Sequence, residues 1–201
     1  MALEITRTSV GPMDNIAYLL RDTDAGEALL IDAANDAPVL LGLLRSPDEL
    51  KTVVTTHQHG DHWQALAEVV AATGASTVAH PDDAEPLPVA PDRLVKDGDT
   101  VSVGGHTLSV IHLVGHTPGS IALLWEDPAG PPQLFTGDSL FPGGPGNTWG
   151  DAEAFTSLMD DLERKVFGVL PDETLVHPGH GAGTTLGAER PSLPEWRARG
   201  W

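Results

Sequence analysis

Residues 57–62 read His-Gln-His-Gly-Asp-His and place three imidazoles and one carboxylate within six positions. On a helix the side chains of His57 and His59 would point about 200° apart, since one turn takes about 3.6 residues. In an extended loop, residues two apart face the same side, and the following glycine lets the backbone turn so that Asp61 and His62 face the same space. Imidazole and carboxylate groups gathered in this way are typical ligands of divalent metal ions.

Four ligands in one segment exceed what a single tetrahedral ion uses while it keeps an open position, so the segment favours two ions. Two ions need further ligands. His116, Asp138 and His180 each follow an apolar stretch and have glycine beside or near them. Side chains at such strand ends can reach a shared rim, and we interpret these three as the remaining candidate ligands.

The apolar pattern predicts short strands interleaved with single helices. Strands are expected at 3–10, 16–21, 28–32, 52–55, 76–79, 100–103, 106–112, 121–125, 134–136 and 175–177, and helices at 37–44, 63–73 and 151–166, with Asp151 as N-cap. The acidic, proline-rich stretch 81–91 is expected to be a surface loop. We expect an α+β fold with two packed mixed sheets and helices outside, in a single domain over residues 1–201 with a surface tail at 188–201.

The composition excludes several classes of protein. The chain has 201 residues, 40% of them apolar, with 11 basic and 29 acidic side chains and a formal charge of −18. An intrinsically disordered chain is excluded by the apolar content, and a nucleic-acid partner is disfavoured because phosphate binding needs clustered Lys and Arg. Cysteine is absent, which excludes thiolate ligands and disulfides. No apolar run is long enough to span a membrane, and residues 1–10 do not read as a secretory signal, so we expect a cytoplasmic protein.

Together these segments resemble the metallo-β-lactamase superfamily, most closely its small glyoxalase II-like (hydroxyacylglutathione hydrolase-like) thioester hydrolases. The local contexts are Gly-His-Thr-Pro-Gly around His116 and Phe-Thr-Gly-Asp-Ser-Leu-Phe around Asp138, and the resemblance spans roughly residues 15–181. It implies a four-layer αββα sandwich with two mixed sheets face to face and the metals at one edge.

The resemblance also implies an allocation of ligands. The first site would consist of His57, His59 and His116, the second of Asp61, His62 and His180, and Asp138 would bridge them. The cofactors would be two divalent ions, zinc first, with iron or manganese as alternatives because such ligands accept several metals. A metal-bridging hydroxide would attack the activated carbonyl of a small-molecule hydroxyacyl thioester, with Asp61 and Asp138 as catalytic carboxylates.

The sequence departs from glyoxalase II after Asp138. The segment 141–149 contains neither the cysteine nor the arginine of the family's Cys-Gly-Arg pattern, and too few residues follow His180 for a helical glutathione-binding domain. We therefore do not expect this protein to make the glutathione contacts of glyoxalase II. We expect Asn147 to hydrogen-bond a substrate amide and Trp149 to cover the acyl group; plain loop flexibility is the alternative explanation of this glycine-rich segment.

Other polar residues have two interpretations. Asp32 ends an apolar strand and is either a partner of a metal-bound histidine or a turn residue. His177 either orients a ligand or simply ends a strand. His80, His106 and His112 are interpreted as surface or supporting histidines, and Trp196 and Trp201 as packing anchors partly buried in a surface tail.

Three alternative functions stay open. A mononuclear iron persulfide dioxygenase would use His57, His116 and Asp138. A lactone or β-lactam hydrolase would use the same chemistry on another activated carbonyl. A non-catalytic binding module is the third alternative, disfavoured because the ligand set is complete; a nuclease is disfavoured by the charge. The sequence leaves the oligomeric state, the acyl group and the thiol carrier undetermined.

Overall fold

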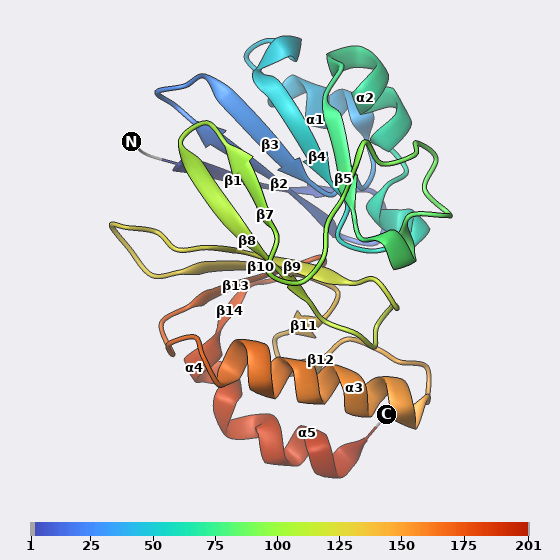
Figure 1. Ribbon diagram of the computed structural model, residues 1–201, viewed down its shortest axis with the longest axis vertical. Coiled ribbons are helices and arrows are strands. Elements are labelled where there is room, and N and C mark those ends of the chain that lie inside the picture. The colour runs from blue at the N-terminus through green and yellow to red at the C-terminus, as the bar shows by residue number, and fades with distance from the viewer. Residues whose placement is uncertain (1–2, 201) are drawn as a thin grey trace.

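The computed structural model describes residues 3–200 and contains two six-stranded sheets packed face to face (Figure 1). The first sheet has the spatial order β1 (Leu3–Val10), β2 (Asn15–Asp22), β3 (Glu27–Ile31), β4 (Leu50–Val54), β5 (Ser76–Ala79) and β6 (Arg93–Leu94). Its first three strands pair antiparallel, and the strands from β3 to β6 pair parallel. The sheet is therefore mixed, as expected.

The second sheet is mixed as well. Its order is β14 (Thr184–Thr185), β13 (Leu175–Pro178), β10 (Gln133–Gly137), β9 (Ile121–Trp125), β8 (His106–His112) and β7 (Thr100–Val103). Only β10 and β13 pair parallel. A small separate pair, β11 (Leu140–Phe141) and β12 (Gly144–Pro145), lies in the connection after β10. Strands β8, β10 and β13 consequently end at the same edge of their sheet.

Strand β2 shows how the sequence pattern builds the layers. Ile16, Tyr18 and Leu20 point into the core between the sheets, whereas Ala17 and Leu19 point toward the helices on the outer face. Successive side chains of a strand alternate between its faces, and every residue of β2 is buried because both faces are covered.

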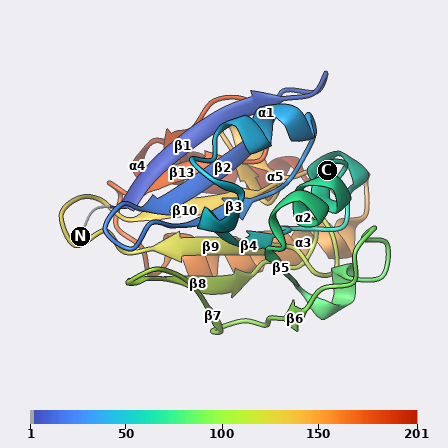
Figure 2. The ribbon, with the colours of Figure 1, turned by 90° about the horizontal axis from the view of Figure 1, so that it is seen from above.

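Helices cover both outer faces, which gives four layers (Figures 1 and 2). Helices α1 (Ala37–Gly42) and α2 (Leu66–Thr73) pack on the first sheet. Helices α3 (Ala152–Asp161), α4 (Leu186–Glu189) and α5 (Leu193–Arg199) lie beside the second, and α3 and α5 bury apolar side chains against it. The predicted αββα sandwich is confirmed, as is the N-cap of α3, where Asp151 accepts hydrogen bonds from the amides of Glu153 and Ala154.

Element boundaries differ from the expectation in several places. The ten predicted strands are present, but β6, β11, β12 and β14 were not predicted, because two residues are too short for a periodic pattern. The helix expected at 63–73 begins only at Leu66 and is preceded by a 3-10 turn at Gly60–His62. The helix expected at 151–166 ends its α-helical part at Asp161 and continues as a π-helical segment, Leu162–Phe167.

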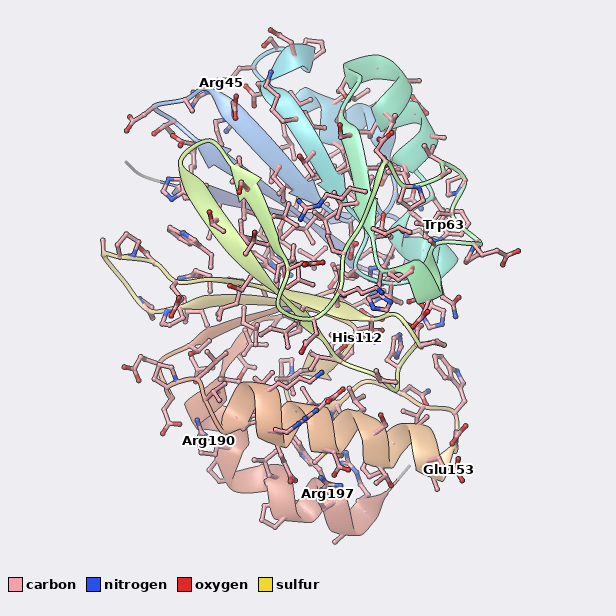
Figure 3. All side chains as sticks on the ribbon, viewed as in Figure 1. Arg45, Trp63, His112, Glu153, Arg190 and Arg197 are labelled. Carbon is pink, nitrogen blue, oxygen red and sulfur yellow. The ribbon has the colours of Figure 1, made fainter. Side chains whose placement is uncertain are left out.

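Within residues 188–200, the expectation of a surface tail with partly buried indoles is wrong for Trp196, which is only 2% exposed. Its ring packs near Phe167, with centroids 6.3 Å apart. Arg197 extends from α5 toward α3 and pairs with Glu163 at 2.9 Å and also with Asp160 (Figure 3). Trp201 lies outside the described residues. Apolar burial on the outer face of the second sheet thus recruits this segment into the helical layer.

Candidate metal centre

All seven predicted ligands lie at one edge of the sandwich. Each follows the carboxyl end of a strand: the segment 57–62 comes after β4, and His116, Asp138 and His180 come after β8, β10 and β13. The two sheets are joined at this edge, because the amide of Ile16 donates to the carbonyl of Gly179 at 2.7 Å and the amide of Ile121 donates to that of Thr56 at 2.9 Å. Residues as far apart in the sequence as His57 and His180 are therefore held in one place.

The candidate ligand atoms form three overlapping groups, each with all its atoms within 4.8 Å of one another. The groups are His57, His59 and His116; His57, His62 and Asp138; and Asp61, His62 and His180. Asp138 lies between the others: its Oδ1 is 3.4 Å from Nε2 of His62, and its Oδ2 is 3.4 Å from Nε2 of His180 and 3.7 Å from that of His116. The structure thus brings together every predicted ligand.

Acceptors behind the imidazoles orient four of the five histidines. Nδ1 of His57 lies 3.0 Å from Thr56 Oγ1, and Nδ1 of His62 lies 2.9 Å from Asp32 Oδ2. In His116 and His180, Nδ1 lies 2.9 Å from the carbonyl oxygens of Asn147 and Met13, respectively. Since each of these Nδ1 atoms donates, each Nε2 faces the centre, where it can hold either a proton or a metal ion. His59 instead presents Nδ1, which is 3.0 Å from Nε2 of His116.

This arrangement fits cation binding. The Nε2 atoms of His62 and His180 are 3.2 Å apart, and two lone pairs facing each other at that distance repel unless a proton or a cation lies between them. Among residues 3–200, Nε2 of His57 and Oδ1 of Asp138 are buried without a hydrogen-bond partner, a costly state for polar atoms. A Cβ at Gly179 would overlap Asp138 Oδ1 and come within 2.6 Å of His62 Cε1, so glycine is needed beside the cluster.

The pKa values of the site follow from burial and opposite charges. Burial lowers the pKa of His116 to about 4 and that of His57 well below its usual value, so both imidazoles are neutral at pH 7. For His62, burial lowers the pKa, but the neighbouring Asp138 and Asp32 outweigh burial and raise it to about 10. Burial raises the pKa of Asp138, but His180 and His62 outweigh it and hold this pKa well below its usual range. The carboxylate is therefore ionised, as a metal ligand must be.

Two supporting residues were missed from the sequence. Asn15, buried at the start of β2, donates from Nδ2 to Asp61 Oδ2 at 2.8 Å. Asp83 is only 1% exposed although the segment 81–91 reads as a surface loop. It accepts from the amides of Gln58 at 3.0 Å and Gly119 at 2.8 Å, and from the Thr117 hydroxyl. Asp83 thus connects the loop that carries His57 and His59 with the loop that carries His116. Proximity in space, not a motif, reveals both residues.

The structure defines the surroundings of the polar residues that have two interpretations from the sequence. Asp32 is a partner of His62. His177 packs on Phe135 and lies with Nε2 2.8 Å from Gln133 Oε1. The rings of His80 and His112 stack on each other with centroids 3.9 Å apart, outside the seven-residue cluster.

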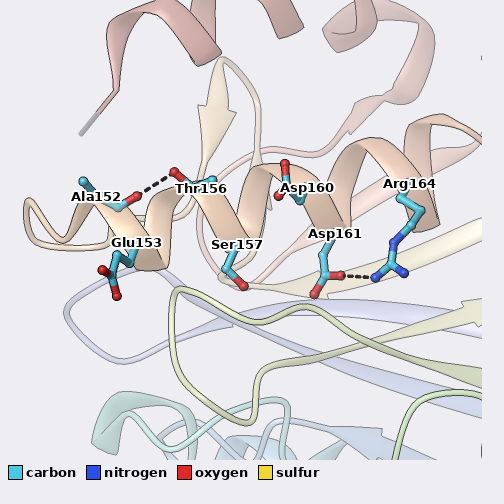
Figure 4. A pocket seen from close by; sticks show the side chains of 7 residues that line it. All are labelled: Ala152, Glu153, Thr156, Ser157, Asp160, Asp161 and Arg164. Carbon is cyan, nitrogen blue, oxygen red and sulfur yellow. Dashed lines mark hydrogen bonds and ion pairs between the residues drawn. The ribbon is translucent and has the colours of Figure 1, made fainter.

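Of the two predicted substrate-binding residues, Trp149 stands over the centre and lines a cavity beside it. The Oδ1 atom of Asn147 instead accepts from the amide of Trp149 at 2.7 Å. A larger hollow of about 660 Å³ lies along the exposed face of α3 (Figure 4). In it Asp161 pairs with Arg164 at 2.9 Å, and it contains none of the seven candidate ligands.

An αββα sandwich with a histidine- and carboxylate-lined edge defines the class of protein as a candidate metalloprotein. A family model described as the metallo-β-lactamase superfamily matches residues 10–180. The chain belongs to this superfamily, as the sequence motifs predict, and membership implies binding of divalent metal.

Relatives and solved structures refine this assignment. The chain is 39% identical over 169 residues to a hydroxyacylglutathione hydrolase of Fuscovulum blasticum, covering 83% of this chain but 62% of that protein. It is also similar to the B3 metallo-β-lactamase BLEG-1 (26% identity, TM-score 0.82, covering 96% of this chain and 99% of the other). A third similar protein, TTHA1623, was solved in a di-iron-bound form (34% identity, TM-score 0.76, covering 92% of this chain and 96% of the other).

Among residues 3–200, no helix has the length and apolar character to cross a membrane.

Proposed function

We propose that the protein is a metal-dependent hydrolase that cleaves a hydroxyacyl thioester. The observation that carries the proposal is the convergence of seven imidazole and carboxylate side chains, whose lone pairs face one centre. In this proposal His57, His59 and His116 would hold one cation and Asp61, His62 and His180 a second. Asp138, which lies between these residues, would complete both sites. The similarity to a hydroxyacylglutathione hydrolase supports the choice of a thioester.

Two divalent ions supply an activated water near neutral pH and polarise a carbonyl oxygen. The chain's own residues do the rest. Asn15 holds the Asp61 carboxylate by a 2.8 Å hydrogen bond, so that Asp61 can orient the attacking water and accept its proton. The carbonyl of Asn147 and the carboxylate of Asp32 fix the directions of His116 and His62. A thiolate leaving group, with a pKa of about 8.5 for an ordinary thiol, needs no strong general acid.

We propose zinc as the resident metal, with iron or manganese as alternatives. Nitrogen and carboxylate ligands accept all three, and the similar protein in a di-iron-bound form supports keeping iron open. A cytoplasmic location and the absence of a nucleic-acid partner stay predictions based on composition.

The test combines elemental analysis of the protein as isolated with a panel of lactoyl and other hydroxyacyl thioesters. We expect two metal ions per chain and hydrolysis that falls by at least about a hundredfold in Asp138→Ala, because this carboxylate lies beside ligands of both proposed cations, His116 on one side and His62 and His180 on the other. The matched control is Glu173→Gln, an exposed carboxylate outside the cluster. Inactivity of fully metal-loaded protein against the whole panel would refute the proposal.

The same panel separates the alternatives. One iron per chain with oxygen consumption on a persulfide would indicate a dioxygenase using His57, His116 and Asp138. Cleavage of lactones or β-lactams in preference to thioesters would indicate a lactone or β-lactam hydrolase with the same metal-dependent chemistry. The similarity to a B3 metallo-β-lactamase supports this option. An unchanged cellular role in Asp138→Ala would favour a binding module.

A further inference from the structure

A cavity of about 370 Å³ opens directly beside two of the candidate ligands, His59 and His116. Its lining comes from three segments that are distant in sequence: the loop after β4, the loop after β8, and the segment that leads into α3. A group bonded to a carbonyl at the metal centre can extend into this space. The cavity is therefore positioned to select one arm of the substrate.

One side of the cavity is apolar. The Trp149 side chain is exposed (64% for the residue), and its ring centroid lies 5.2 Å from those of both His59 and His116. Its backbone has φ +53°, which is unfavourable for an aromatic residue. The Asn147 side chain holds this conformation by accepting from the Trp149 amide at 2.7 Å. Strain of this kind clusters at ligand-binding sites, and here it keeps a large apolar surface available to a ligand.

The charged part of the lining is negative. Asp151 lines the cavity, and none of the described lining residues is Lys or Arg. Asp151 Oδ1 accepts from the amides of Glu153 at 2.9 Å and Ala154 at 3.0 Å. The amino end of α3, which would otherwise attract an anion, is thus already occupied by the chain's own carboxylate. A substrate carboxylate entering here would meet the like charge of Asp151, and no Lys or Arg among the described lining residues would pair with it.

We propose that this cavity binds the thiol-carrier arm of the thioester. It accepts an uncharged carrier and discriminates against carriers with carboxylates, with Asp151 as the specificity-determining residue. The inference rests on the proposed thioester hydrolysis and deepens it by naming the substrate class. The arm packs against Trp149 and Pro118, and the side-chain amide of Gln58, a residue that also lines the cavity, offers polar contacts. The consequence is a preference for neutral thiol carriers over glutathione-like ones.

The test uses a matched pair of substrates, the lactoyl thioesters of 3-mercaptopropionamide and 3-mercaptopropionate, which differ only by amide against carboxylate. We expect the wild type to favour the amide in kcat/KM. Asp151→Asn retains the helix cap but removes the charge, so it should reduce this preference by about three- to fivefold, the range of one partly screened charge. Raising the salt concentration should also reduce the wild-type preference for the amide substrate, because salt screens the charge of Asp151.

Two further variants serve as controls for apolar contact and for net charge. Trp149→Ala should weaken the binding of both substrates alike, because it removes apolar contact and no charge. Glu173→Gln makes the same change in net charge away from the cavity and should leave the ratio unchanged. A wild-type preference for the carboxylate substrate, or an unchanged ratio in Asp151→Asn, would overturn the proposal.

Non-hydrolysable thioether-ketone analogues of the two substrates test binding in the cavity independently of hydrolysis. Their dissociation constants, measured by calorimetry on the metal-loaded protein, need no turnover. If neither thioester is hydrolysed but the amide ketone binds more tightly and Asp151→Asn narrows the difference, the hydrolase assignment fails and the cavity assignment stands. Equal binding of the two ketones would refute the cavity assignment.

Discussion

The carboxylate of Asp32 lies 2.9 Å from Nδ1 of His62, and both side chains are buried. The same Asp32 oxygen accepts a 2.8 Å hydrogen bond from the Thr56 hydroxyl, which is 3.0 Å from Nδ1 of His57. One carboxylate therefore determines which nitrogen of two candidate ligands faces the metal centre. Replacing a partner of this kind typically costs about 10- to 100-fold in metal affinity.

Asp32→Asn is expected to weaken metal binding by about 10- to 100-fold without unfolding the protein. Both Asp32 oxygens accept hydrogen bonds, from Thr56 and from His62 Nδ1, whereas asparagine offers only one acceptor oxygen. Asparagine tolerates the φ of +58° at this position. Competition with a chromogenic chelator measures the affinity, and circular dichroism checks the fold. Asp36→Asn is the matched control, since Asp36 is exposed and also has a positive φ. Equal affinities of wild type and Asp32→Asn would contradict this role.

Asp83→Ala is expected to reduce both the stability of the metal-free protein and its metal affinity. The substitution leaves the half-buried amide of Gln58 and the buried amide of Gly119 without their acceptor, and a buried unpaired donor costs about 1–3 kcal/mol. It also disconnects the two ligand-bearing loops. Urea unfolding and chelator competition measure the two effects. Glu85→Ala, an exposed carboxylate in the same segment, should change neither; a loss of stability with full metal affinity would limit Asp83 to a structural role.

The contrast between the ligands and Asp83 shows what the sequence could predict. Histidine and aspartate at fixed spacing, directly after apolar strands, predict a metal site because strand ends meet at one edge of a sheet. Asp83 has no such context: it stands between prolines and acidic residues, and its burial arises only when the loop after β8 folds over it. Asp32 is an intermediate case, because its position at a strand end indicated a role without selecting one.

Trp196 shows the same limit in the fold. Its segment has no long apolar period, and its burial depends on the outer face of the second sheet, which is assembled from strands and α3 earlier in the chain. The layers themselves were predictable because their alternating or helical apolar patterns are local. Contacts made by one large side chain across the layers are not local, and no pattern in the sequence indicates them.

His177 is expected to make the protein less stable in mild acid. Burial lowers its pKa to about 4, whereas an unfolded histidine has a pKa of about 6.5. As the pH falls from about 6.5 to 4, the unfolded state binds a proton that the folded state does not, so stability decreases by up to about 3 kcal/mol and is unaffected by this group above that window. Urea unfolding across this pH range should give a flatter profile for His177→Gln, since only this group differs. Parallel profiles for the two proteins would contradict the assignment.

Trp196→Ala is expected to destabilise the protein by about 3–5 kcal/mol, the usual cost of removing a buried aromatic side chain. The neighbouring Arg197 provides an internal control. Its side chain is 31% exposed and pairs with Glu163 and Asp160, which are 39% and 63% exposed, and ion pairs in such surroundings contribute about 0–1 kcal/mol. Arg197→Gln should therefore cost less than about 1 kcal/mol in the same urea titration. If the two variants were equally destabilised, α5 would be held by its ion pairs rather than by the indole, and apolar burial would not explain why this segment joins the helical layer.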